Sequence, residues 1–389
     1  MPGKYVKTRE PGIYRQTLES GAVRYRVVVS VGKDENGNYK QRTYTSTTMA
    51  DAKAKKAEVQ AEVAKGVHVH KRDELTVNRH LDSWLTGKRS LKPSTLAGYR
   101  HALKPARAAF GERPLQKITK ADVDRLVNGL LTSSPHRPGG AAPRTINSML
   151  VVLQQAFADA ERQGVVPRNV VALVSRVSNH DNDDGEARRR FNTWSQQEAA
   201  TFMDHVSDDR LSGGWTLTRL GLRLGEVMGM RWSDIDLDAG TLTVRRTRIL
   251  VDGLVVEGTP KSQRSRRTLH IGPHAAGALR AAKKRQAEER IAAPAWLDSG
   301  FVVTDEIGRP LKPDVYQRAF KRHVEAAGVP GLRLHDVRHT SVTLMLDGGL
   351  PVHKVAAWHG HDPNMTYSVY CNAKADEETG ALVDHLMFG

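Results

Sequence analysis

A polar run near the middle of the chain, residues 178–186, places the strongest constraint on the fold. It contains only polar residues and one glycine and has no hydrophobic periodicity, so it predicts neither a helix nor a strand with a buried face. The chain has 389 residues, 39% of them hydrophobic, and is too long for one ordinary core. We therefore expect a linker over residues 177–190, and three separately folded domains in all.

The charged residues are distributed unevenly along the chain. Residues 1–180 carry 31 Lys and Arg against 15 Asp and Glu, whereas residues 181–389 carry 28 of each. The whole net charge of +16 therefore lies in the first 180 residues. Such an asymmetry favours a polyanionic partner, and we expect double-stranded DNA. The alternative is a basic surface that is merely solvated.

Cysteine content and hydropathy exclude several classes of protein. Cys371 is the only cysteine, which excludes an intrachain disulfide and a zinc site with four thiolates. No apolar run approaches the roughly 20 residues that a membrane-spanning helix needs, and the N-terminus lacks the apolar segment of a signal peptide. We expect a protein of the reducing cytosol, with no membrane partner.

The first domain, residues 1–66, is predicted to be a small sheet followed by a helix. Turn residues separate three strand-like runs, at 12–18, 24–31 and 39–46. Thr48 and Asp51 have the spacing of a helix-capping pair. Arg24 and Arg26 share one face of the second strand, and a sheet face that carries arginines can enter a DNA major groove. An ordinary exposed face explains these two arginines equally well.

The second domain, residues 70–176, has helical patterns throughout. Helices are predicted over residues 75–85, 94–110, 123–131 and 144–163. Thr119 and Asp122 form a capping box before the third helix. Basic residues gather around the first connection of this bundle: Lys88, Arg89, Lys92, Arg100, Lys104 and Arg107. A basic helical bundle can hold a DNA duplex through its phosphates without reading the sequence.

The third domain, residues 191–389, mixes helices with short strands. Ser195 and Glu198 have the spacing of a capping box, and a later helix over 215–230 is expected to carry Arg223. Further helices are expected over 273–291 and 313–328, and strands over 241–251 and 267–271. The predicted fold class is α+β: a three-stranded sheet with a helix, an all-helical bundle, and a mainly helical domain with a small antiparallel sheet.

Residues that can handle a phosphate gather near the end of the chain. His335, Arg338 and His339 lie within five positions, and Tyr370 follows His361 by nine residues. A guanidinium can bind two phosphate oxygens, and an imidazole can move a proton. A phenol becomes a nucleophile when a base and a cationic pocket help it ionise. The cluster predicts phosphate chemistry that needs neither a metal nor another cofactor.

Several segments resemble, in order and approximate spacing, the signature of the tyrosine recombinases of the phage-integrase type. They are residues 221–226, Lys261 in a polar loop, residues 335–340, and Gly360 and His361 followed by Tyr370. The resemblance covers about residues 190–380. Residues 70–175 resemble the core-site DNA-binding domain of that family, and residues 1–65 resemble the arm-site-binding domain of lambda-type integrases.

The resemblance implies a phosphate clamp of two arginines. Arg223 and Arg338 would bind the two non-bridging oxygens on which charge develops during cleavage. Glu226 would orient Arg223, although a plain salt bridge between the two is the simpler interpretation of that pair alone. Arg264 and Arg266, and also Arg267, are expected to contact phosphates or to be solvated.

The resemblance also implies a nucleophile and groups that move protons. Tyr370 would attack the phosphorus, and His335 would accept the phenol proton. His361 would hydrogen-bond the phosphate or assist the transfer. By resemblance alone, Lys261 would protonate the leaving 5′ oxygen.

Some assignments have alternatives. Tyr367 is a rival nucleophile, Arg219 competes with Arg223, and Trp358 is expected to belong to the core. Five histidines offer an alternative metal site: His335, His339, His353, His359 and His361. The sequence departs from the family at His359, where an apolar residue, often Leu, is usual. That departure bears on the role of His361.

The predicted function is that of a site-specific DNA recombinase, a phage or mobile-element integrase that forms a 3′-phosphotyrosyl intermediate. Two duplexes that exchange four strands need four nucleophiles, which implies a homotetramer on double-stranded attachment sites. A bacterial host cytosol with nucleoid association, a host DNA-bending protein and an excision factor are implied as well. Residues 376–388 look like a short helix that docks on a neighbouring protomer or on its own domain. A type IB topoisomerase and a catalytically inactive DNA-binding regulator are the alternatives.

Overall fold

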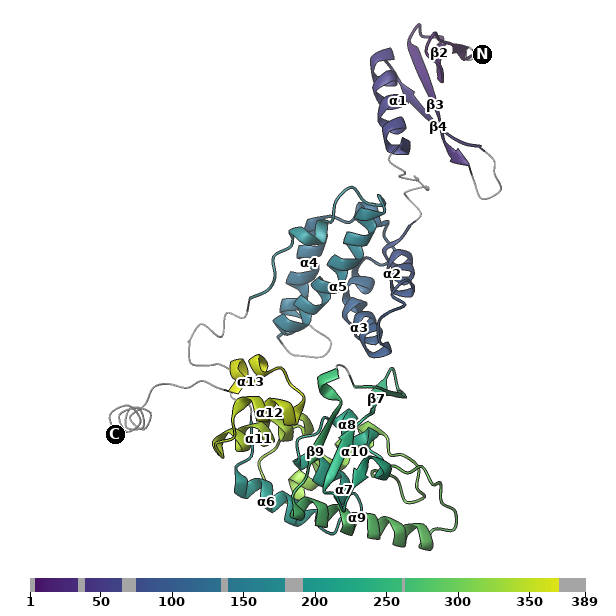
Figure 1. Ribbon diagram of the computed structural model, residues 1–389. Coiled ribbons are helices and arrows are strands. Elements are labelled where there is room, and N and C mark those ends of the chain that lie inside the picture. Colours follow the sequence, from purple (N-terminus) through teal and green to yellow (C-terminus); the bar gives the residue numbers. More distant parts are fainter. Residues whose placement is uncertain are drawn as a thin grey trace, which may run out of the picture. The chain divides into compact units, whose positions relative to one another are not determined.

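The computed structural model describes residues 4–33, 39–64, 75–133, 139–178, 192–260 and 263–370 (Figure 1). The chain divides into two compact units, Met1–Asp183 and Asp184–Gly389. The described residues form one hydrophobic core around Ile13 and Val27, a second around Leu103 and Phe157, and a third around Trp215. Most of the predicted linker lies outside the described residues.

The first core belongs to a four-stranded antiparallel sheet covered by one helix. The strands follow one another in the order β1 (Val6–Lys7), β2 (Ile13–Thr17), β3 (Val23–Lys33) and β4 (Tyr39–Ser46). The sequence predicted the last three, and β1 is too short to show an alternating pattern. Helix α1 (Met49–Ala64) packs against β3 and β4. At its start, Thr48 Oγ1 donates to Asp51 Oδ2 at 2.7 Å, as the spacing of this pair predicted.

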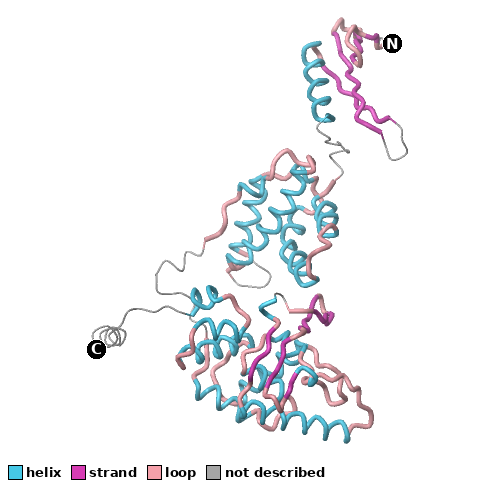
Figure 2. Tube along the Cα trace, in the orientation of Figure 1, coloured by secondary structure: helices cyan, strands magenta, loops and turns pink. Residues whose placement is uncertain are grey.

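The second core lies within a bundle of helices (Figure 2). The helices are α2 (Val77–Thr86), α3 (Pro93–Phe110), α4 (Lys120–Thr132) and α5 (Pro143–Arg162). The predicted capping box of α4 is present, since Thr119 Oγ1 accepts from the backbone N–H of Asp122 and the Asp122 carboxylate accepts from that of Thr119. Such a cap stabilises a helix by about 1 kcal/mol.

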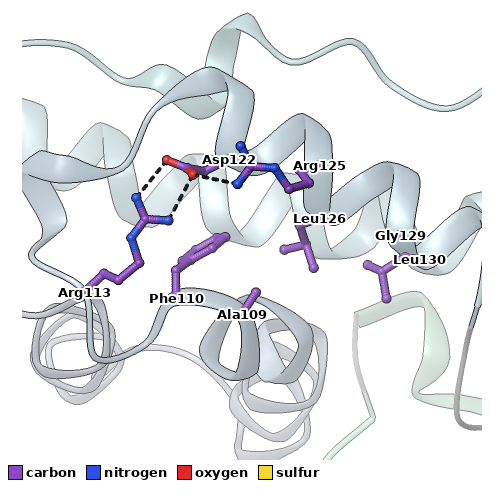
Figure 3. Close-up of a pocket in the computed structure, with 8 residues that line it drawn as sticks. All are labelled: Ala109, Phe110, Arg113, Asp122, Arg125, Leu126, Gly129 and Leu130. Carbon is purple, nitrogen blue, oxygen red and sulfur yellow. Dashed lines mark hydrogen bonds and ion pairs between the residues drawn. The ribbon is translucent and has the colours of Figure 1, made fainter.

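A pocket of about 290 Å³ opens between α3 and α4 (Figure 3). Its apolar wall includes Phe110 and Leu126, and an ion pair lies at its edge. There Arg113 donates to both carboxylate oxygens of Asp122, at 2.9 and 3.0 Å. This pocket belongs to the helical bundle and holds none of the residues that the sequence predicted to be catalytic.

The third core is built around aromatic side chains. Trp215 stacks on Tyr316 with ring centroids 4.3 Å apart, and Phe202 meets Trp215 edge-on. The surrounding helices are α6 (Gln196–His205), α7 (Ser212–Arg219), α8 (Leu224–Gly229), α9 (Pro273–Ala292), α10 (Pro313–Ala326), α11 (Leu334–Asp347), α12 (Val352–His359) and α13 (Pro363–Tyr370). The capping box predicted from Ser195 and Glu198 begins α6.

Two small sheets complete this unit. The first has the order β5 (Ile235–Asp236), β6 (Thr241–Val244) and β9 (Arg267–His270), and the second is the hairpin of β7 (Thr247–Val251) and β8 (Leu254–Gly258). The sequence predicted a single strand over 241–251, but this run belongs to both sheets and is interrupted at Arg245 and Arg246. Strand β8 was not predicted.

The predicted helix over 215–230 is wrong, because the structure divides it into α7 and α8. Gly221, in the turn between them, has φ +81, a backbone conformation that side chains disfavour. Arg223 is the N-cap residue of α8 and does not lie inside a helix. Among the described residues, no helix is both long and apolar enough to cross a membrane.

Candidate active site

The turn between α7 and α8 fits closely against the end of α12. A Cβ atom on Gly221 would lie 2.4 Å from Cε1 of His359 and 2.8 Å from Oγ of Ser341. Both distances are shorter than any ordinary contact, so only glycine is accommodated there. The turn thereby places Arg223, two residues later, beside the end of α12.

Arg223 is held by one carboxylate and two backbone carbonyl groups. Its Nη1 donates to Oε1 of Glu226 at 2.9 Å and to the carbonyl oxygen of His359 at 3.3 Å. Its Nη2 donates to the carbonyl oxygen of Gly360 at 3.2 Å. The side chain remains 35% exposed. The guanidinium is therefore oriented by the protein and still open to a ligand.

Arg338, on α11, is also held by backbone carbonyl groups, and one of them is that of His359. Its Nη1 donates to the carbonyl oxygen of Gly221 at 2.6 Å, and its Nη2 donates to that of His359. The same Nη2 lies 2.5 Å from Nε2 of His361. Arg223 and Arg338 thus share the His359 carbonyl as an acceptor, with His361 beside them. The structure brings together three of the six residues predicted to be catalytic.

The histidines near this cluster favour the neutral form. Burial and then the charge of Arg338 lower the pKa of His361 to about 3. Desolvation and then the charge of Arg338 also lower the pKa of His335. Burial and then the charge of His335 lower the pKa of His339 to about 4. At neutral pH these imidazoles are therefore uncharged, and an uncharged imidazole is what the role predicted for His335 requires.

His359, at the family's usual apolar position, is completely buried. Its side chain is 0% exposed, and neither ring nitrogen has a hydrogen-bond partner among the described residues. Its ring stacks on that of His361 with centroids 5.6 Å apart. Burial, followed by the charge of Arg338, lowers its pKa far below the usual value. His359 therefore fills the position of an apolar residue as a neutral imidazole.

Glu226 pairs with a second arginine that the sequence analysis did not assign to the site. Arg267 on β9 donates to both oxygens of Glu226, at 3.0 and 3.1 Å, and the side chains are 7% and 1% exposed. Arg267 was expected to contact a phosphate or to be solvated, and it is not solvated. A signal was available, because strand alternation places Arg267 on the same face as Leu269, a core residue.

The neighbouring arginines lie outside this cluster. Arg264 is exposed and pairs with Asp362, and Arg266 is exposed as well. Arg219 is partly buried, which lowers the pKa of its guanidinium. Trp358 is partly buried against the core, as predicted, and its Nε1 donates to the carbonyl oxygen of Leu220 at 2.9 Å.

The remaining predicted residues are the two tyrosines of α13, Lys261, and the C-terminal residues 376–388. Tyr370 is the last residue of α13, which packs against α12. Tyr367, the rival nucleophile, is 57% exposed on the same helix. Lys261 and residues 376–388 lie outside the described residues.

The DNA-binding candidates of the first two domains lie on surfaces. Arg24 and Arg26 are exposed on β3, where buried Val27 points to the other face. On the helical bundle, Lys88 lies 4.7 Å from the centre of the Trp84 ring. Lys88 is partly buried, whereas four of the other candidates there are exposed: Arg89, Lys92, Arg100 and Lys104. Arg107 instead forms an ion pair with Asp82 at 2.6 Å.

The alternative metal site would draw on the histidines of α11 and α12. The rings of His335 and His339 meet edge-on with centroids 5.1 Å apart, so they do share a helix face. In the part of the chain that the structure describes, no group of three or more His, Cys, Asp or Glu side chains is arranged to hold a metal ion.

Comparisons with known proteins identify the class of protein to which this fold and site belong. Residues 196–377 match the model of the phage integrase family, and residues 76–131 match the N-terminal SAM-like domain of phage integrases. The integrase of Mycobacterium phage L5 is 30% identical over 308 residues, which cover 78% of this chain and 77% of that protein. The chain belongs to the phage integrase family of tyrosine recombinases.

Other matches cover most or almost all of this chain. A XerC-like tyrosine recombinase of Caldanaerobacter subterraneus subsp. tengcongensis is 26% identical over 94% of this chain and 96% of its own. Among solved structures, the Tn1549 transposon integrase in complex with transposon right end DNA matches with a TM-score of 0.64 and 18% identity, over 81% of this chain and 100% of its own. A lambda integrase dimer bound to a COC′ core site matches with a TM-score of 0.54 and 18% identity, over 96% and 98%. These structures share the fold.

Proposed function

We propose that this chain is a site-specific DNA recombinase that cuts DNA strands and rejoins them through a covalent 3′-phosphotyrosyl intermediate. The proposal rests on the convergence of Arg223 and Arg338 on the carbonyl oxygen of His359, with His361 beside Arg338. Two guanidinium groups and an imidazole in one place suit a phosphate with two charged non-bridging oxygens. Membership of the phage integrase family supports the same activity.

In the proposed reaction the arginine pair stabilises the transition state. Attack on the phosphorus increases the charge on the non-bridging oxygens, and the oriented guanidinium groups meet that charge without reorganising. Removing one such donor typically costs about 10²- to 10³-fold in rate. His361, held neutral and close to Arg338, contributes a further hydrogen bond to the phosphate.

Tyr370 is proposed as the nucleophile. Its phenolic oxygen forms the new bond to phosphorus while the bond to the 5′ oxygen breaks, and His335 takes the phenol proton. Lys261 donates a proton to the departing 5′ oxygen, which leaves as a hydroxyl group. Because the phosphodiester energy is kept in the phosphotyrosyl bond, rejoining to another 5′-hydroxyl needs no ATP.

The rest of the chain is proposed to hold the DNA. Residues 70–176 would grip the duplex next to the cleavage site through exposed basic residues such as Arg89 and Lys104, and residues 1–66 would bind a second sequence through β3. A solved lambda integrase forms a tetramer bound to a Holliday junction. We propose a homotetramer on attachment sites here, with a host DNA-bending protein and an excision factor as accessory partners in a bacterial host cytosol.

A trapping experiment tests this function. The protein is incubated with nicked half-sites prepared from the DNA that flanks its own gene. After cleavage, the short fragment with the free 5′-hydroxyl diffuses away, so the reaction cannot reverse. A denaturing gel should show a protein–DNA adduct with the correct half-site and none with scrambled DNA. Adducts formed equally on any DNA, with relaxation of supercoiled plasmid, would indicate a topoisomerase, and the absence of adducts would indicate a DNA-binding regulator.

A further inference from the structure

Glu226 is buried and forms ion pairs with two arginines, Arg223 and Arg267. Its carboxylate accepts from Nη1 and the backbone N–H of Arg223, at 2.9 and 3.0 Å, and from Nη1 and Nη2 of Arg267, at 3.1 and 3.0 Å. One carboxylate therefore neutralises part of the charge of two guanidinium groups. Burial alone would raise the pKa of Glu226, but the hydrogen bond and charge of Arg267, followed by the charge of Arg223, bring it below the usual value.

The two arginines differ in how accessible their side chains are to a substrate. Arg267 is 7% exposed, and besides its two bonds to Glu226 it donates through Nε to the carbonyl oxygen of Trp358 at 2.5 Å and through Nη1 to that of Ser265 at 3.1 Å. Arg223 is 35% exposed and lies at the proposed phosphate site. Arg267 is therefore far less accessible to a substrate than Arg223.

We propose that Arg267 is a positioning residue, which fixes the Glu226 carboxylate and balances its charge so that Arg223 keeps its orientation and its positive charge for the scissile phosphate. The inference rests on the proposed role of Arg223. Without Arg267, Glu226 would have Arg223 as its only cationic partner. It would then neutralise the guanidinium that the phosphate needs, at a separation where Coulomb interactions are strong in a partly buried site.

The contacts around Arg267 also link it to the other half of the clamp. A Cβ atom on Gly360 would lie 3.3 Å from Nη1 of Arg267 and 2.9 Å from the carbonyl oxygen of Arg264, so the turn before His361 packs directly on the start of β9. Through Trp358 and Gly360, Arg267 holds the end of α12, where the His359 carbonyl orients both clamp arginines. It thus positions Arg223 from two sides.

The test compares single-turnover adduct formation on the nicked half-site for wild type, Arg267→Met, Glu226→Gln and the double variant. Arg267→Met should form adduct at least about 30-fold more slowly, while its DNA affinity stays within about threefold. Adding Glu226→Gln should restore at least about threefold of that loss, because the unbalanced carboxylate is gone. A double variant slower than Arg267→Met would overturn the inference.

Two further variants separate positioning from loss of folding. Arg267→Lys keeps the charge but not the paired geometry, so its rate should fall between those of wild type and Arg267→Met. A rate as low as that of Arg267→Met would refute charge balance. Arg210→Met is the matched control, because Arg210 also donates twice to a carboxylate, that of Glu289, and once to a carbonyl group, that of Thr304. Its rate should be unchanged.

A modified substrate distinguishes positioning from a purely structural role, because a structural role predicts the same rate defect on both substrates. A methylphosphonate at the scissile position removes one charged oxygen, so a weakened Arg223 matters less there. The defect of Arg267→Met should shrink to within about threefold on that substrate, and an equal defect on both substrates would contradict the inference. If wild type forms no adduct on either, the proposed function fails too. A wild-type adduct with an undiminished Arg267→Met rate would overturn the inference alone.

Discussion

At the scale of single residues, the site depends on backbone carbonyl groups as much as on side chains. The His359 carbonyl accepts from both Arg223 and Arg338, and the Gly221 carbonyl accepts from Arg338. The motif spacing predicted which arginines matter. It could not predict their acceptors, because those depend on how α8, α11 and α12 pack together.

Arg338 offers the sharpest single substitution. Arg338→Lys keeps a positive charge but cannot donate through two nitrogens to Gly221, His359 and His361 at once. Half-site cleavage should fall about 100-fold while DNA binding is retained. The matched control is Arg333→Lys at the N-cap position of the same helix, where the side chain is 80% exposed. Cleavage by Arg338→Lys at the wild-type rate would mean that bidentate contact is not needed.

The lowered pKa values of three histidines predict how stability depends on pH. His339 and His361 have folded-state pKa values of about 4 and 3, and that of His359 is also lowered, whereas an unfolded histidine titrates near 6.5. Below pH 6.5 the unfolded chain therefore binds more protons than the folded one. Stability is complete above pH 6.5 and falls as the pH drops toward the folded values, by up to about 1.4 kcal/mol per histidine and pH unit.

Denaturant unfolding at pH 7.5, 6.0 and 5.0 checks this dependence. His359→Leu should have a shallower loss of stability with acid than wild type, because one buried imidazole is gone and Leu suits the apolar position. His353→Leu, an exposed change on the same helix, should match the wild-type slope. Equal slopes for wild type and His359→Leu would show that His359 is not the group that resists protonation.

At the scale of elements, capping patterns predicted helix starts well, and hydrophobic periodicity predicted most helices to within two residues of their ends but missed the turn that divides residues 215–230. Ser195 with Glu198 and Thr119 with Asp122 begin α6 and α4 as expected, since a capping box is a local feature. The predicted helix over 215–230 failed because apolar residues continue through the turn at Gly221. There the packing of His359 and Ser341 against Gly221 determines the backbone conformation.

The α7–α8 turn predicts a strong effect for Gly221→Ala. The change combines an unfavourable positive φ with a Cβ 2.4 Å from the His359 ring, so we expect a loss of about 2 kcal/mol of stability and of most cleavage. Gly253→Ala has nearly the same φ, +80, and no atom within 4 Å of its Cβ, so it isolates the backbone cost. Thermal unfolding and half-site cleavage measure both. If the two variants behave alike, the contact with His359 is unimportant.

At the scale of the whole molecule, the sequence predicted a basic first half and a catalytic second half. Composition alone revealed the charge asymmetry, because charge counts need no structure. The exposed arrangement of Arg89 and Lys104 on the helical bundle required the fold. The sequence contains no pattern that directly specifies the proposed exchange of four strands by a tetramer.

The salt dependence of DNA binding tests the proposed role of the bundle. Removing one cation that neutralises a phosphate should reduce the slope of log affinity against log salt by about 0.9. Arg89→Gln combined with Lys104→Gln should therefore reduce the slope by up to about 2. Lys284→Gln combined with Lys321→Gln, at side chains 81% and 80% exposed in the catalytic unit, should leave it unchanged. An unaltered slope in the first double variant would remove these residues from the DNA interface.

The most direct test of the account is to identify the residue joined to DNA. Wild type and the variants Tyr370→Phe and Tyr367→Phe are incubated with the nicked half-site, and the adducts are digested and analysed by mass spectrometry. We predict a nucleotide on the peptide that contains Tyr370 in wild type and in Tyr367→Phe, and no adduct in Tyr370→Phe. An adduct that persists in Tyr370→Phe would contradict the proposed reaction centre.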